Sequence, residues 1–163
     1  MPDTPVAAVT TGFFRPGERT TSGSLQRGNL TAEVFPLLSQ DRYDELLWSC
    51  NCNFVRGEDS FVRAQWAGRP FVWHIYPQKE NVHWIKLNAF VDRFTAEMPP
   101  DAADSLRGFW RGWVSGRGAG PAWPAFRAHS GQICARAKAW SEQQAARPDL
   151  ATNLLQFAHK LIK

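Results

Sequence analysis

The chain has 163 residues, 44% of them hydrophobic and 21% charged, which is enough to bury the core of one globular domain. Its net charge is +4, and the basic residues are dispersed along the sequence instead of forming a Lys/Arg block. This pattern argues against nucleic acid as a partner and suits a small anionic ligand or an acidic protein. No apolar run approaches the length of a membrane span and no signal peptide is recognisable, so neither a membrane nor export is indicated.

The cysteines and the aromatic residues narrow the possibilities further. Cys50, Cys52 and Cys134 are odd in number, and Cys50 and Cys52 stand too close together for a zinc site. We therefore expect three reduced thiols in a cytoplasmic protein and no metal site. The eight Trp and eleven Phe predict either a dense core or a surface that stacks on planar ligands or docks a partner.

The N-terminal part of the chain carries weak structural signals. Residues 1–14 contain the apolar positions of a short helix, and residues 18–29 are rich in Thr, Ser and Gly and predict a loop. Residues 30–38 alternate in polarity and predict a strand, with a proline near its end. Asp41 is expected to cap a helix that runs to Trp48.

Residues 48–77 predict a strand, a glycine turn, a helix and a second strand. Residues 53–55 and 71–73 are the two apolar runs, and the helix between them is expected to begin at Asp59 or Ser60. Strands that alternate with helices favour a parallel sheet with crossover connections. The stretch therefore looks like half of a doubly wound nucleotide-binding unit.

After Pro77 the sequence predicts helices alone. The expected elements are helices over 81–94, 101–114 and 123–146, a loop over 115–121, and a last helix over 150–162 that follows a cap at Pro148-Asp149. We predict an α/β fold with a short, Rossmann-like parallel sheet and a helical C-terminal part. Because a doubly wound sheet needs more strands than these, the chain reads as part of a larger protein.

The turn before the central helix is the main candidate site. Ligands of parallel sheets bind beyond the carboxyl ends of the strands, where the N-terminus of a helix presents free N–H groups. The Ser60 hydroxyl and these amides can hold a diphosphate, and Arg56 can neutralise it. The alternative is that Asp59 and Ser60 merely cap the helix. Arg63 also flanks the turn and can neutralise a phosphate, but its place on the surface of the helix favours a solvated role.

Other polar residues follow predicted strands and are candidates for the same crevice. His74 ends the second strand, with Tyr76 and Gln78 just beyond it, although His74 can equally be an ordinary hydrogen-bonded histidine. Gln40 and Tyr43 follow the strand predicted over 30–38. A glutamine can read the edge of a pyrimidine and an aromatic ring can stack on it, while the alternative for Tyr43 is packing in the core.

Three runs of this region closely resemble the protein-arginine rhamnosyltransferases that modify elongation factor P. They are YDELLW at 43–48, NFVRGEDSFVRAQWAG at 53–68 and PFVWHIYPQ at 70–78. The tail residues 148–152 and 156–157 are also similar to the end of that family, and the resemblance covers about 26–163.

The resemblance implies a GT-B fold whose C-terminal half, here residues 1–163 as a single domain, binds the nucleotide sugar. It implies inverting transfer of L-rhamnose from TDP-L-rhamnose to an arginine of elongation factor P, without a cofactor. It assigns the thymine base to Gln40 and Tyr43, and catalysis to Glu58. The donor-binding set at the turn then comprises Arg56, Gly57, Asp59 and Ser60.

The family's N-terminal half, which holds the acceptor and the aspartates that act as general base, has no match in this sequence. A guanidinium is protonated near neutral pH, so its reaction requires a carboxylate that orients and deprotonates it. We therefore expect this chain to bind the donor but to be inactive alone. The alternative is a non-catalytic Rossmann-like binding module or protein-interaction fragment, with aromatic residues exposed for a partner.

Overall fold

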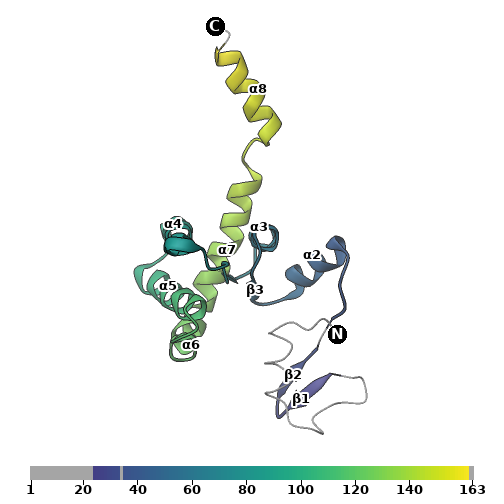
Figure 1. Ribbon diagram of the computed structural model, residues 1–163, viewed down its shortest axis with the longest axis vertical. Coiled ribbons are helices and arrows are strands. Elements are labelled where there is room, and N and C mark those ends of the chain that lie inside the picture. Colours follow the sequence, from purple (N-terminus) through teal and green to yellow (C-terminus); the bar gives the residue numbers. More distant parts are fainter. Residues whose placement is uncertain (1–23, 34, 162–163) are drawn as a thin grey trace. The chain divides into compact units, whose positions relative to one another are not determined.

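A computed structural model describes residues 24–33 and 35–161 of the chain (Figure 1). They belong to a first unit, Met1–Tyr43, and a second unit, Asp44–Lys163. The short helix expected within residues 1–14 lies outside the described residues. In the part of the chain that the structure describes, no helix is long and apolar enough to cross a membrane.

The first unit contains a β-hairpin, which differs from the prediction. Strands β1 (Leu25–Arg27) and β2 (Leu30–Ala32) pair antiparallel, so β1 arises inside the predicted loop and β2 covers only the start of the strand expected over 30–38. Gly28 has a φ of 59°, the left-handed conformation that a two-residue hairpin turn requires. This turn folds β2 back onto β1, and β2 is therefore not a strand of the parallel sheet.

Helix α2 (Gln40–Ser49) begins two residues before its expected start. The N–H of Tyr43 donates to the Ser39 carbonyl at 2.9 Å, and the N–H of Arg42 approaches the Ser39 hydroxyl at 3.5 Å. Ser39, and not Asp41, therefore occupies the capping position. Asp41 lies in the first turn, where its negative charge still complements the helix dipole.

The second unit contains the predicted strand–turn–helix–strand element. Strands β3 (Asn53–Val55) and β4 (Phe71–Trp73) pair parallel, and α3 (Glu58–Trp66) is the helix between them. Asn53 is buried, and its side-chain amide donates to the Leu47 carbonyl at 3.0 Å, which ties the start of β3 to α2. The sequence therefore predicts this element correctly, although α3 starts at Glu58 and not at Asp59 or Ser60.

The remainder is helical, as expected. The elements are η1 (Lys79–Asn81), α4 (Val82–Thr95), α5 (Pro100–Val114), α6 (Ala119–Ala128), α7 (Ser130–Ala145) and α8 (Leu150–Leu161). The single helix predicted over 123–146 is wrong, because the backbone leaves the helical region at His129 (φ −98°, ψ 15°) and separates α6 from α7. The weak helix formers Ser130 and Gly131 follow this break. The α/β class and the helical C-terminal part are confirmed.

Aromatic side chains form the core of the second unit. The Phe71 ring of β4 lies 5.4 Å from Trp110 of α5 and 5.6 Å from Phe94 of α4, measured between centroids. All three side chains are buried. Phe90 stacks on Trp110 with an angle of 16° between the rings, and Trp140 of α7 meets Phe94 at 5.5 Å. Many of the Trp and Phe residues therefore belong to the core, which is one of the two predictions made from their number.

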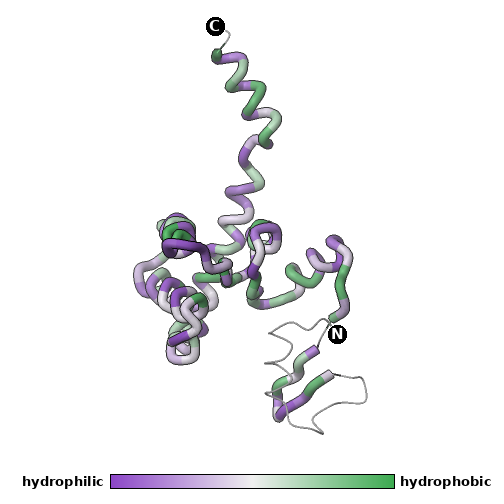
Figure 2. The backbone as a smooth tube through the Cα atoms, in the orientation of Figure 1, coloured by the Kyte–Doolittle hydropathy of each residue, from purple (hydrophilic) through white to green (hydrophobic). Residues whose placement is uncertain are grey.

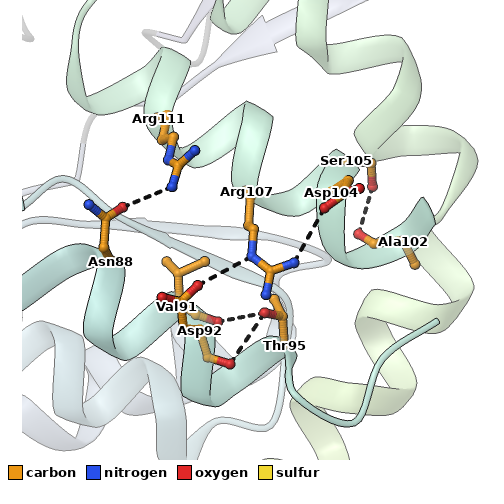
Figure 3. Close-up of polar contacts among 9 residues, drawn as sticks. All are labelled: Asn88, Val91, Asp92, Thr95, Ala102, Asp104, Ser105, Arg107 and Arg111. Atoms are coloured by element: carbon orange, nitrogen blue, oxygen red, sulfur yellow. Dashed lines mark hydrogen bonds and ion pairs between the residues drawn. The ribbon is translucent and has the colours of Figure 1, made fainter. Parts of the chain in front are cut away.

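Polar contacts join α4 to α5 on the outside of this core (Figure 3). Arg107 bridges two carboxylates, with Asp92 of α4 at 3.4 Å and Asp104 of its own helix at 3.3 Å. Arg111 donates to the side-chain oxygen of Asn88 at 3.3 Å. Since each contact has at least one exposed partner, each contributes about 1 kcal/mol or less.

Helix α8 lies at the surface of the second unit along its whole described length. Asp149 caps it, accepting a hydrogen bond from the Thr152 N–H at 2.9 Å, so the expected cap is confirmed. Hydrophobic and hydrophilic residues both occur along α8 in Figure 2, and none of its side chains is buried. Leu150 and Phe157 are among the large apolar side chains that remain exposed there.

Candidate functional site

The carboxyl ends of β3 and β4 bring the predicted turn and the predicted histidine together. The N–H of His74 donates to the Val55 carbonyl at 2.7 Å, one residue past the end of β4. The indole N–H of Trp73 donates to the Arg56 carbonyl at 2.9 Å. These two bonds hold the start of the turn against the end of β4, which is the edge where parallel sheets bind ligands.

The start of α3 offers donors for an anion. Gly57 precedes the helix in an extended conformation (φ −71°, ψ 162°), and no side chain caps the helix there. The interpretation of Asp59 and Ser60 as mere caps is therefore wrong. The first bond of the helix runs from the Phe61 N–H to the Gly57 carbonyl at 2.9 Å, so the amides of the first turn have no partner within the helix. Such amides, together with the helix dipole, favour a phosphate.

Ser60 and Tyr76 both lie close to Gly57. The Ser60 hydroxyl donates to the Gly57 carbonyl at 2.9 Å. A Cβ placed on Gly57 would lie 3.8 Å from Ser60 Oγ and 4.0 Å from Tyr76 Cε2. The Arg56 guanidinium lies over the Tyr76 ring, 4.7 Å from its centroid, a cation–π contact worth about 0.5–1 kcal/mol at an exposed site. Tyr76 therefore borders the turn, as expected, and holds Arg56 there.

His74 is half-buried beside this group. Burial first, and the positive charge of Arg56 second, lower the pKa of His74 below its ordinary value of 6.5. The imidazole is therefore neutral near pH 7 and can donate or accept one hydrogen bond on each nitrogen. Gln78 lies just before η1, and its backbone N–H donates to Nδ1 of His83 at 3.1 Å.

The sequence suggests a solvated Arg63, but in the structure its guanidinium is paired with two carboxylates. Its guanidinium lies 2.9 Å from Asp59 on α3 and 2.8 Å from Asp44 on α2. The hydrogen bond to Asp59 first, and that to Asp44 second, raise the pKa of Arg63 above its ordinary value. The spacing of Asp59 and Arg63 is a signal that the sequence contains, whereas Asp44 reaches the pair only through the packing of α2.

The other predicted site residues lie on exposed or half-buried surfaces. Glu58 opens α3 and is exposed; Gln40 is exposed at the start of α2, and Tyr43 is half-buried one turn further on. Gln40 and Tyr43 share a helix face, because residues three apart are neighbours on a helix. They belong to the first unit, while Arg56, Gly57, Glu58, Asp59 and Ser60 belong to the second. The roles assigned to all seven residues stay predictions.

The three cysteines are free thiols, as expected. Burial and the neighbouring Cys50 raise the pKa of Cys52 to about 11, so this thiol is not a reactive thiolate near neutral pH. Among residues 24–33 and 35–161, no three His, Cys, Asp or Glu side chains gather to hold a metal ion.

The chain is an α/β protein that presents helix amides, a guanidinium and an aromatic ring at the carboxyl ends of two parallel strands, an arrangement that favours an anionic ligand. Residues 3–159 match the family model "Elongation-Factor P (EF-P) rhamnosyltransferase EarP", and the chain belongs to this family. The family that the three sequence runs resemble is thereby confirmed.

Curated relatives agree with this assignment. The chain is 53% identical over 131 residues to a protein-arginine rhamnosyltransferase of Pseudomonas putida and 49% identical over 131 residues to that of Pseudomonas aeruginosa. Each match covers 80% of this chain and 35% of the relative, so the matched part spans about a third of those proteins. A solved structure on EarP-mediated arginine glycosylation of translation elongation factor EF-P matches with a TM-score of 0.78 at 42% identity. That match covers 95% of this chain and 48% of the solved chain.

Proposed function

We propose that this chain is the donor-binding part of a protein-arginine rhamnosyltransferase, and that it binds TDP-L-rhamnose for inverting transfer to an arginine of elongation factor P. The observation that carries the proposal is the uncapped start of α3 at the carboxyl end of β3, inside the runs that match the family. The relatives bear the names of enzymes of this activity. On this proposal the chain is a Rossmann-like half of a GT-B enzyme, works in the cytoplasm and needs no cofactor.

Each residue of the turn then has a distinct task. The free amides of α3 bind the diphosphate, and the Ser60 hydroxyl turns from the Gly57 carbonyl, its partner in the ligand-free chain, to donate to it. Arg56 balances the charge of the diphosphate while Tyr76 holds the guanidinium in place. Gly57 leaves room for the ligand beside Ser60, since a side chain there would stand in contact with Ser60 and Tyr76. Asp59 accepts hydrogen bonds from sugar hydroxyls.

Glu58 is the catalytic carboxylate that this chain contributes. Its position at the first residue of α3 places it next to the proposed diphosphate, on the side where the sugar and the acceptor meet. A carboxylate there can orient the acceptor guanidinium, whose charge it complements. Gln40 and Tyr43 bind the thymine base, by hydrogen bonds to its edge and by stacking.

Titration calorimetry with thymidine diphosphate and with TDP-L-rhamnose tests the donor site. We expect saturable binding of both ligands by the 163-residue chain and about tenfold weaker binding by Ser60→Ala, whose far-ultraviolet circular dichroism spectrum should match that of the wild type. A folded protein that binds neither ligand would favour the alternative function, a binding module that docks a protein partner through exposed aromatic residues such as Trp48 and Trp66.

A transfer assay tests the division of labour. We expect no rhamnosylated elongation factor P when the chain, TDP-L-rhamnose and the acceptor are incubated and analysed by mass spectrometry, because the resemblance assigns the general base to the half of the family that this sequence does not match. Arginine rhamnosylation by this polypeptide alone would contradict that expectation while leaving the donor site in place.

A further inference from the structure

We propose that Arg63 is a positioning residue of the donor site: it holds the Asp59 carboxylate away from the bound diphosphate and offsets part of its charge. The inference rests on the proposed donor site and adds to it a residue that touches no ligand itself. It starts from the fact that the first turn of α3 carries two carboxylates, Glu58 and Asp59, where an anion is to bind.

The Arg63 guanidinium restrains the Asp59 carboxylate. Arg63 lies one turn after Asp59, and its Nε donates to Asp59 Oδ2 at 2.9 Å. The same guanidinium donates through Nη1 to Asp44 Oδ2 on α2 at 2.8 Å. Two nitrogen atoms of the Arg63 guanidinium are bound to separate carboxylates, and the side chain is only 23% exposed. The guanidinium therefore restrains the direction in which the Asp59 side chain points. The Asp59 side chain is still 76% exposed, so a ligand hydroxyl can reach it.

The charges around the turn explain why this restraint matters for an anion. Arg56 is the cation at the turn, and Glu58 and Asp59 oppose it. Without Arg63, the unpaired Asp59 carboxylate would repel the diphosphate and compete with it for the free amides of α3, as N-terminal carboxylates do. Arg63 therefore lowers the negative charge that the start of α3 presents to a phosphate.

The bridge of Arg107 provides a matched control within the same molecule. Arg107 also spans an aspartate of its own helix and one of the preceding helix, with a side chain that is 29% exposed (Figure 3). Both bridges join neighbouring helices of the second unit, but only Arg63 contacts a residue of the turn. A merely structural role predicts similar consequences for the loss of either arginine.

The experiment measures the dissociation constant of thymidine diphosphate and the melting temperature for the wild-type chain and for Arg63→Gln, Arg63→Lys, Asp59→Asn, Asp59→Asn with Arg63→Gln, and Arg107→Gln. We expect Arg63→Gln to weaken binding about tenfold, the effect of one nearby charge at a protein surface, and Arg107→Gln less than about twofold. Arg63→Lys keeps the charge, so its affinity for thymidine diphosphate should lie between those of the wild type and Arg63→Gln. It also provides a milder variant should Arg63→Gln fail to fold.

The decisive comparison is the effect of Arg63→Gln in the Asp59→Asn background. Since Arg63 acts through the Asp59 carboxylate, the tenfold loss should shrink to about twofold there, a coupling that a general loss of stability does not produce. Equal losses in both backgrounds, or wild-type affinity in Arg63→Gln, would overturn the inference while leaving the donor site intact. Absence of thymidine diphosphate binding by the wild-type chain would overturn the donor site and this inference together.

Discussion

Within the second unit, strand β4 connects two regions that are built from opposite kinds of contact. At its start, Phe71 lies among the buried rings of Phe94 and Trp110. Beyond its end, His74 and Tyr76 stand beside the exposed Arg56 and the polar turn. The aromatic core contributes stability through close packing, whereas the turn keeps polar groups available for a ligand. Stability and ligand binding should therefore respond to different substitutions, although a single strand serves both.

The largest effect is expected in the core. Phe94→Ala removes a ring that is 1% exposed and contacts Phe71, Phe90 and Trp140, so it should lower the free energy of unfolding by about 3–5 kcal/mol. Denaturant unfolding measures this change. Ile85→Ala on the same helix removes a side chain that is 69% exposed and should cost about 0.5 kcal/mol or less. A similar cost for both variants would contradict the proposed core.

The second effect concerns the packing of α5 against α6. A Cβ on Gly112 would lie 2.7 Å from the Ala119 backbone nitrogen, closer than atoms can approach, so Gly112→Ala should destabilise the chain by about 1–3 kcal/mol. Gly108 lies on the same helix, and a Cβ there meets no atom within 4 Å. Gly108→Ala should stabilise by about 0.5–1 kcal/mol, since alanine favours the helix. Thermal unfolding of the two variants should therefore shift in opposite directions.

The third effect is expected at the turn, where a substitution should weaken ligand binding while changing the free energy of unfolding little. Ser60→Ala should weaken thymidine diphosphate binding about tenfold, as expected for one lost hydrogen bond to a charged group, and lower the free energy of unfolding by about 1 kcal/mol or less. Ser105→Ala is the matched control, because the Ser105 hydroxyl makes the same local bond, to the Ala102 carbonyl at 2.8 Å (Figure 3). Equal affinities for the two variants in calorimetry would count against a ligand role for Ser60.

The smallest effect is a pH dependence at His74. Burial and then Arg56 lower its pKa below 6.5, so the folded protein binds this proton less readily than the unfolded chain. The resulting contribution to stability is fully present above pH 6.5 and is lost as the pH falls through the pKa of the folded state. Nuclear magnetic resonance titration of the imidazole measures that pKa. Arg56→Gln should raise it without restoring 6.5, because burial remains, whereas Arg107→Gln should leave it unchanged.

The sequence by itself determined the elements whose signals are local. The strand–turn–helix–strand order of residues 53–73, the helices after Pro77 and the Asp149 cap follow from apolar spacing, glycine positions and capping residues within one or two turns. The candidate turn was predictable for the same reason, since Gly57, Glu58 and Ser60 are consecutive or nearly so. Its identity as part of a family followed from the residue order alone.

The tertiary structure decided what depends on residues far apart in the chain. Asp44 reaches Arg63 and Trp140 reaches Gln65 only because helices pack, and a propensity signal contains no information about that pairing. The hairpin of β1 with β2 and the break at His129 are likewise outcomes of competition between weak local preferences, which turn geometry and packing resolve. Arg63 shows the consequence: its spacing from Asp59 is visible in the sequence, whereas only the fold brings Asp44 to the same guanidinium.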